Sequence, residues 1–238
     1  MCVLVSAAAF LFSGCMESRV DPYTEVFCGG KSLDAKCIVV FDGKDNEKYI
    51  SEQRHSFCLS EPFIEITARE PAGNSGCRLA GADFYVKKPV PDNAGPMILD
   101  SLYAKLLLTL VTVGDSGWDQ ASASANSVKL FGTDYKTFTI KPSLSGDSTG
   151  QTGLSVHSVP WAQIKVYANM EKKVIDRVTV KNLKTGAELS GYAYNWRKIN
   201  YIDKKVPTKI DIISTGNWDL DADTSIQINY LDFEIIQP

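Results

Sequence analysis

Two stretches near the end of the chain, VPTKIDIIS at residues 206–214 and SIQINYLDFEII at residues 225–236, decide the fold class. In the first stretch Ile210 and Ile212 alternate with charged residues, and in the second Ile226 and Ile228 alternate with the polar Gln227 and Asn229. Successive side chains of an extended chain point to opposite faces of a sheet, so each stretch has one aliphatic face and one polar face. We therefore predict two antiparallel strands that cover a core with one face and meet water with the other.

The same alternation, followed outward from these stretches, predicts six more strands. They are residues 37–41, 62–68, 78–86, 163–168, 174–180 and 189–201. Lys184-Thr185-Gly186 and Asp203-Lys204-Lys205 are typical hairpin turns, which make the strands beside them antiparallel neighbours. Pro207 cannot donate to a ladder, so we expect it at the beginning of its strand or facing an edge.

One helix is predicted from Met97 to Val113, because Leu102, Leu106 and Leu110 recur four residues apart. Gly114 would cap its end. Further leucines make the apolar arc wider than a surface stripe, so the helix should pack deeply against the apolar face of the sheet. The predicted fold class is mainly β (α+β): a curved antiparallel sheet or half-open barrel with one hydrophobic helix in or over its concave face.

Small and polar residues predict loops at 115–126 and 143–152 and a turn at 73–76. The segment DLDAD at 219–223 spaces its carboxylates like the first half of a calcium loop. Thr224 then stands where that loop needs Gly, and Tyr230 stands where it needs Glu. A polar hairpin turn is therefore the better interpretation.

The amino terminus predicts a cleaved lipoprotein signal. Residues 1–14 are uncharged and largely apolar, too short for a membrane span, and they end in Ser13-Gly14 before Cys15. This pattern resembles a bacterial lipobox, which implies cleavage before Cys15 and a lipid anchor, such as palmitate, on its new amino terminus. Residues 15–24 would form a lipidated tether. The alternative is an ordinary buried first helix. The resemblance also implies that Met16, which is not Asp, permits transfer to the periplasmic face of the outer membrane.

Removal of 14 residues from 238 leaves 224 residues, enough for the single β-rich domain that we predict at residues 25–238. A net charge of −3 and the lack of a Lys/Arg cluster argue against a nucleic-acid partner. We expect a monomer whose membrane contact is the N-terminal lipid.

Four cysteines remain beyond Cys2 and Cys15, and an even set in an exported chain favours two disulfides of undetermined pairing. These candidates are Cys28, Cys37, Cys58 and Cys77. Buried thiols and a metal site are the alternatives. Separations of 9, 21 and 19 residues contain no C-x-x-C knuckle, so we expect neither a metal nor another cofactor.

The sequence carries little sign of catalysis. The two histidines, His55 and His157, have no supporting motif, and the adjacent Ser56 and Ser158 define no triad. Acidic residues such as Glu61 occur without a spacing that singles out a glycosidase pair. We therefore expect no enzyme, with a periplasmic hydrolase as the least favoured reading.

The segments 196–201, 206–212 and 226–235, together with the preceding hairpin from Val174 to Tyr194, resemble the closing strands of the LolA/LolB-type lipoprotein carriers. The resemblance covers roughly residues 160–238. It implies an open antiparallel half-barrel covered by helices, in proteins that carry or receive acylated lipoproteins or sense lipid-like ligands.

A curved antiparallel sheet with one apolar face, plugged by a hydrophobic helix, can leave an internal cavity lined by alternate strand residues. The resemblance implies that its lining includes Tyr192, Tyr194, Ile210, Ile212, Ile226 and Ile228, and we add Val178, Ile164, Leu102 and Leu106. Such a cavity suits an acyl chain, a lipid or a lipoprotein, because apolar burial contributes about 0.8 kcal/mol per CH₂. The same residues would also suit a fully packed core. A structural or assembly lipoprotein that presents a protein-binding surface is the second hypothesis.

Overall fold

The computed structural model describes residues 32–43, 48–58, 63–70, 73–80, 83–86, 101–112, 122–141, 162–199, 205–216 and 224–236. These residues form twelve strands and one helix. In chain order they are β1 (Ser32–Asp42), β2 (Lys48–Cys58), β3 (Phe63–Glu70), β4 (Gly73–Ala80), β5 (Asp83–Val86), α3 (Ser101–Thr112), β6 (Ser122–Leu130), β7 (Thr133–Lys141), β8 (Ala162–Asn169), β9 (Val174–Asn182), β10 (Glu188–Lys198), β11 (Lys205–Thr215) and β12 (Ser225–Ile236).

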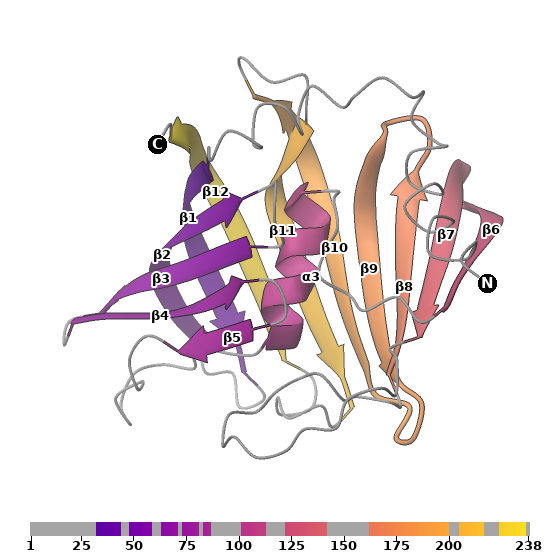
Figure 1. The fold of residues 1–238 in the computed structure, drawn as a ribbon, viewed down its shortest axis with the longest axis horizontal. Helices are drawn as coiled ribbons and strands as arrows, with labels where there is room; N and C mark the ends of the chain where they lie inside the picture. The colour runs from indigo at the N-terminus through magenta and orange to yellow at the C-terminus, as the bar shows by residue number, and fades with distance from the viewer. Residues whose placement is uncertain are drawn as a thin grey trace, which may run out of the picture.

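The strands form one antiparallel sheet in the order β5-β4-β3-β2-β1-β12-β11-β10-β9-β8-β7-β6. The first and last of the described strands, β1 and β12, pair with each other in the middle of this sheet. The two edges are β5 and β6, and the connection between them contains α3. The chain therefore passes from one edge of the sheet to the other through the segment that carries the helix (Figure 1).

The sheet curves around α3. The helix contacts β3 and β4 on one wing and β9, β10 and β11 on the other. Along a flat sheet, β4 and β9 would lie about 34 Å apart at ~4.8 Å per strand, whereas a helix with its side chains is only about 10–12 Å wide. One helix can touch both wings only if the sheet folds around it, and Figure 1 shows this half-barrel with α3 inside its concave side. The predicted fold class is confirmed.

Residues that face each other across neighbouring strands show how the two faces differ. On the inner face one such row runs Phe138, Val166, Val178, Gly191, Ile212 and Ile226, from β7 to β12. All six are buried. The adjacent outer row runs Thr137, Tyr167, Arg177, Tyr192, Asp211 and Gln227. An apolar inner row beside a polar and aromatic outer row is the two-residue period that the sequence predicted.

The predicted strands in the last third of the chain are confirmed, and β12 has the predicted bounds. The turn at Lys184-Thr185-Gly186 is confirmed as well: the Asn182 side-chain oxygen accepts hydrogen bonds from the backbone N–H groups of Lys184 and Thr185. Gly186 takes a φ of 79°, which suits glycine. Pro207 is the third residue of β11, as expected near a strand beginning.

Other predictions were wrong in detail. Residues 78–80 end β4 and residues 83–86 form the separate strand β5, and residues 73–76 belong to β4 rather than to a turn. The structure places β6 over residues 122–126, which were predicted to be loop. The strands β2 and β7 were missed. In β2 only His55 and Phe57 are buried, so its sequence lacks the apolar alternation that marks a strand. The predicted helix is present over Ser101–Thr112, and residues 97–100 of the prediction lie outside the described residues.

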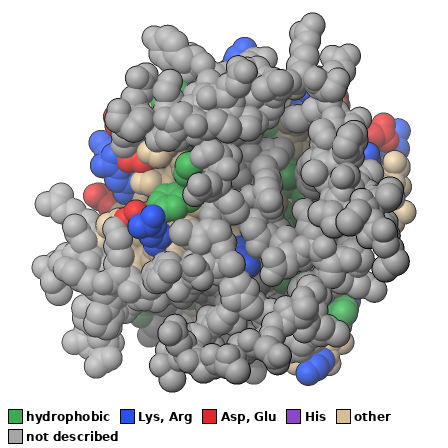
Figure 2. Space-filling model, in the orientation of Figure 1, with side chains coloured by type: hydrophobic (Ala, Val, Ile, Leu, Met, Phe, Trp, Pro, Cys, Tyr) green, Lys and Arg blue, Asp and Glu red, His purple; other side chains and the backbone are tan. Residues whose placement is uncertain are grey.

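Charged side chains of both signs lie beside one another at the margin of the side shown in Figure 2. In the described part of the chain, no helix is both long and apolar enough to cross a membrane.

The predicted anchor Cys15, the tether and Cys28 lie outside the described residues, as do the turn at 219–223, the loop at 143–152 and His157.

Candidate functional site

The inner face of the half-barrel gathers most of the residues that were predicted to line a cavity. Seven of them lie in one buried cluster: Ile164, Val178, Leu106, Ile210, Ile212, Ile226 and Ile228. They come from α3 and from the neighbouring strands β8, β9, β11 and β12. Leu102 belongs to α3, but its side chain is outside the described part of the structure. The sequence therefore identified the apolar surface on which the helix rests.

Tyr192 and Tyr194 do not belong to this surface. They lie on the outer face of β10, where the Tyr192 ring contacts Arg177 and the Tyr194 ring contacts Lys209. The inner-facing residues of β10 are instead Gly191 and Ala193, which pair with Ile212 and Ile210. The prediction was wrong because it chose the larger apolar side chains, whereas the inner face needs small ones where the helix approaches.

The helix α3 packs directly onto Gly191 of β10. A Cβ at this position would lie 2.4 Å from Leu106 Cδ2 and 2.9 Å from Leu110 Cδ1, closer than nonbonded carbon atoms can approach. The two leucine side chains therefore fill the space that any other residue at 191 would need. The absence of a side chain at Gly191 lets the helix approach β10 this closely.

The helix is buried on every side. Each residue from Tyr103 to Val111 is buried, including Lys105 and Thr109. The Thr109 hydroxyl donates to the Lys105 carbonyl oxygen at 2.7 Å. A helix that is buried all round belongs to an interior and not to a surface. In this conformation α3 occupies the concave side, so an apolar ligand can lie along the described inner face only after α3 has moved.

A polar cluster lies on the inner face of the other wing. Its members are Cys37, Gln53, His55, Cys77 and Tyr230 of the sheet, together with Tyr103 of α3. His55 is fully buried, with Nδ1 3.1 Å from the Tyr230 hydroxyl and Nε2 3.0 Å from Gln53 Oε1. Burial lowers the pKa of His55 to about 3, because the imidazolium would lose its hydration. His55 is therefore a neutral core residue with both ring nitrogens satisfied.

Three other members of the polar cluster, Cys37, Tyr103 and Tyr230, are also held neutral. Burial raises the pKa of the Cys37 thiol to about 12. Burial, and then the charges that the Cys37 and Cys77 thiolates would carry, raises the pKa of the Tyr103 hydroxyl well above its usual value. Burial, and then the charges that Cys37 and Tyr103 would carry, raises the pKa of the Tyr230 hydroxyl well above its usual value. None of these groups would be ionised near neutral pH.

The geometry does not assemble a hydrolase triad at His55. Its ring nitrogens contact Tyr230 and Gln53, while Ser56, the next residue on the strand, points to the opposite face. Within the described ranges, no group of three or more His, Cys, Asp or Glu side chains is placed to hold a metal ion.

The predicted disulfides do not occur among the described cysteines Cys37, Cys58 and Cys77. Cys37 lies on β1 and Cys77 on β4, so two strands separate them, which amounts to about 14 Å along the sheet. A disulfide needs Cα atoms within about 7 Å. Cys58 is the last residue of β2, where it lies opposite Ser32 of β1 and Phe63 of β3 in the sheet. It is therefore several residues along the strands from Cys37 and from Cys77. Sequence spacing could not reveal these separations.

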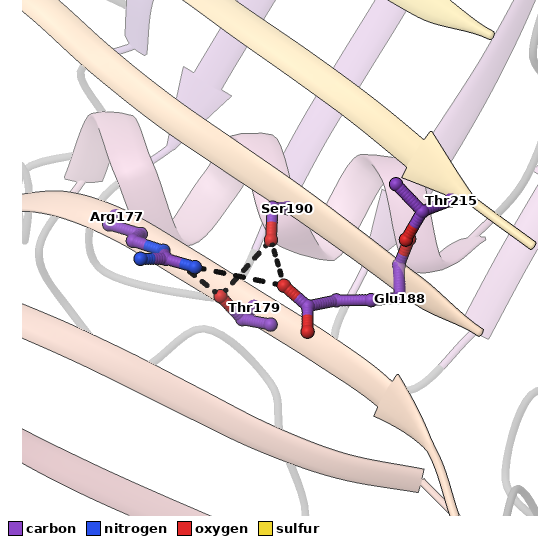
Figure 3. A network of polar contacts seen from close by, with 5 residues as sticks. All are labelled: Arg177, Thr179, Glu188, Ser190 and Thr215. Carbon is purple, nitrogen blue, oxygen red and sulfur yellow. Dashed lines mark hydrogen bonds and ion pairs between the residues drawn. The ribbon is translucent and has the colours of Figure 1, made fainter. Parts of the chain in front are cut away.

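The outer face carries a chain of polar contacts (Figure 3). The Arg177 Nε–H donates to the Thr179 hydroxyl at 3.3 Å, which lies 3.2 Å from the Ser190 hydroxyl. Ser190 in turn donates to Glu188 Oε1 at 2.7 Å. The Arg177 guanidinium also stacks over the rings of Tyr167 and Tyr192, 4.9 and 5.0 Å from their centroids. The hydroxyl groups of Thr179 and Ser190 are therefore both hydrogen-bonded, and neither is placed as a free nucleophile.

No family model matches the sequence, and no curated protein matches it. Solved structures do match the fold. A LolA superfamily protein from Nitrosomonas europaea aligns over 93% of this chain and 92% of its own, with a TM-score of 0.54 and 13% identity. The fold is LolA-like. A domain from Vibrio parahaemolyticus, described as an outer membrane lipoprotein-sorting protein, aligns over 90% of this chain and 89% of its own, with a TM-score of 0.51 and 10% identity. The LolA-like fold thus extends beyond the last third, where the sequence resemblance lies.

Proposed function

We propose that this protein is a lipid-anchored binding protein of the bacterial cell envelope that holds an apolar ligand, such as an acyl chain, a lipid or a lipoprotein, on the inner face of its half-barrel. The observation that carries the proposal is a largely apolar inner face that, in the described part of the chain, is covered by a helix in contact with both wings. The LolA-like fold supports it.

The helix is suited to act as a movable cover. It belongs to the connection between the edge strands β5 and β6, and side-chain contacts hold it on the sheet. Moving it breaks no strand pair. The apolar surface that α3 would uncover can be covered again by an alkyl chain, which regains about 0.8 kcal/mol per buried CH₂. Ligand and helix therefore compete for the same inner face.

The envelope location of the proposal rests on the amino terminus. Cleavage before Cys15 would leave a lipid-modified cysteine and a polar tether, and Met16 favours the outer membrane. The domain would act as a monomer on the periplasmic side, with its half-barrel held near the bilayer. Catalysis is not part of the proposal.

A disulfide lock between helix and sheet tests the proposal directly. The Cβ of a residue at 191 lies 3.2 Å from Leu106 Cγ, so the Cβ atoms of residues 106 and 191 lie within about 5 Å. This is near the ~3.8 Å separation that a disulfide needs. The variant L106C/G191C should therefore close a bond between α3 and β10 when it is oxidised.

The measurement is binding of cis-parinaric acid, a fluorescent fatty acid, to the oxidised and the reduced variant. We expect the reduced form to bind and the oxidised form to bind at least about tenfold more weakly, because the helix can no longer leave. The single variants L106C and G191C control for the substitutions. Equal binding by the locked and the unlocked forms would place the ligand elsewhere, and no binding by the wild-type chain would refute the function.

Mass spectrometry of lipid extracted from the gently purified wild-type chain supplies an independent check. A carrier should retain an acyl lipid in stoichiometric amount. Recovery of none would count against the proposal.

A further inference from the structure

Two buried hydroxyl groups on the inner face have no hydrogen-bond partner within the described part of the chain. They are Ser214 Oγ, at the end of β11, and Thr224 Oγ1, immediately before β12. Only 1% of Ser214 and 3% of Thr224 is exposed. A buried polar group that has lost its water and found no partner costs free energy, so such groups are rare and call for an explanation.

The two residues are neighbours across the β11–β12 hairpin. The Ser214 backbone N–H donates to the Thr224 carbonyl oxygen at 3.0 Å. Ser214 follows Ile212 by two residues and Thr224 precedes Ile226 by two, so both side chains share the inner face with these isoleucines. The strand β11 ends, and β12 begins, at the end of the sheet opposite the labelled C-terminus (Figure 1).

From this pair an apolar path runs along the inner face. Ile226 and Ile228 continue from Thr224 along β12, and Tyr230 of the polar cluster ends the path after about 20 Å, at ~3.3 Å per residue. The path is therefore apolar at Ile226 and Ile228 and polar where it starts, at the rim of the inner face where β11 ends and β12 begins.

Other buried hydroxyls of the sheet and helix are satisfied. Thr109 donates to Lys105, Thr137 donates to the Asn126 carbonyl oxygen, and the Thr179 and Ser190 hydroxyls contact each other. The polar cluster likewise satisfies His55 from both sides. The unpartnered state of Ser214 and Thr224 is thus a property of this rim and not of the whole core.

We propose that Ser214 and Thr224 bind the oxygen-bearing head group of an amphiphilic ligand, a carboxyl or ester group, whose acyl chain runs along Ile226 and Ile228. Each hydroxyl can donate one hydrogen bond, and two adjacent donors match the two oxygens of a carboxyl or ester group. The inference rests on the proposed function and adds to it the class of ligand and its direction in the half-barrel.

The test uses two polyene probes, cis-parinaric acid with a carboxyl head and diphenylhexatriene with no polar group, on the wild-type chain and on S214A/T224V. Valine keeps the shape of threonine. We expect the variant to bind cis-parinaric acid about tenfold more weakly, which corresponds to the loss of two hydrogen bonds, while its affinity for diphenylhexatriene stays within about twofold. Its melting temperature should be equal to or above that of the wild type, because no protein hydrogen bond is lost.

The matched control is T179V/S190A, which removes a partnered hydroxyl pair from the outer face. It should melt at a lower temperature and keep wild-type affinity for both probes. If S214A/T224V binds both probes like the wild type, or if S214A and T224V each unfold the chain, the head-group site is wrong. If the wild type binds neither probe, the proposed function itself fails.

Discussion

Replacing His55 with glutamine should change how the stability of the protein depends on pH. In the native state His55 is fully buried between Tyr230 and Gln53, and burial lowers its pKa to about 3. In the unfolded chain the same group has its usual value of about 6.5. Below pH 6.5 His55 of the unfolded chain therefore binds a proton, whereas His55 of the folded protein stays neutral until the pH approaches 3. Stability is fully present above pH 6.5 and is lost as the pH falls toward 3.

The magnitude follows from the two pKa values. Between pH 8 and pH 5 the linkage from His55 removes about 2 kcal/mol from the free energy of unfolding, with a limiting slope of about 1.4 kcal/mol per pH unit below pH 6. The surrounding groups do not add to this slope, because burial raises the pKa values of Cys37, Tyr103 and Tyr230 and keeps them neutral throughout the range.

The assay is urea unfolding of the wild type and of H55Q at half-unit steps from pH 8 to pH 5. Glutamine can still hydrogen-bond to one neighbour but does not titrate. We expect H55Q to be less stable at pH 8 by about 1–3 kcal/mol, and the difference from the wild type to shrink by about 2 kcal/mol at pH 5. Carboxylates elsewhere affect both proteins equally. Parallel curves for the two proteins would refute a neutral buried His55.

Three further predictions test the packing and the turns. Gly191→Ala should lower the free energy of unfolding by about 1–3 kcal/mol, measured by urea titration, because Leu106 must move away from the new Cβ. Phe131 is fully exposed at a φ of 49° in the β6–β7 turn, so Phe131→Asn should raise the melting temperature and add roughly 0.5–1 kcal/mol. When the protein is unfolded without reductant and alkylated, peptide mass spectrometry should find Cys37 and Cys77 labelled. In the folded protein both thiols are buried and should resist labelling. Peptides that stay unlabelled after unfolding would indicate disulfides.

The sequence predicted the inner face well where strands alternate between aliphatic and polar residues. Ile210, Ile212, Ile226 and Ile228 were placed correctly, because their side of the sheet follows from the two-residue period alone. In β10 the two-residue period holds, but the face predicted as the inner one was the wrong one. The tyrosines of this strand are the larger apolar residues, yet they face outward, because the leucines of α3 fit only over Gly191. That choice depends on a partner more than 80 positions away in the sequence.

The strand β2 and the polar cluster could not be found in the same way. His55 and Gln53 carry no apolar signal, and their contacts with Tyr230 exist only because β1 lies between β2 and β12 in the sheet. The separation of the cysteines follows from the same strand order. A one-dimensional spacing contains no information on how many strands will lie between two residues.

The sequence by itself determined the class of structure: strands with one greasy side, hairpin turns between them and one helix too apolar for a surface. These features are local, since they follow from backbone geometry and from the transfer of nearby side chains out of water. Only the tertiary structure decided which side of β10 faces the helix, which thiols stay apart and which hydroxyls stay unpartnered. Those outcomes depend on close packing between distant segments, where one added Cβ or the number of intervening strands changes which contacts can form.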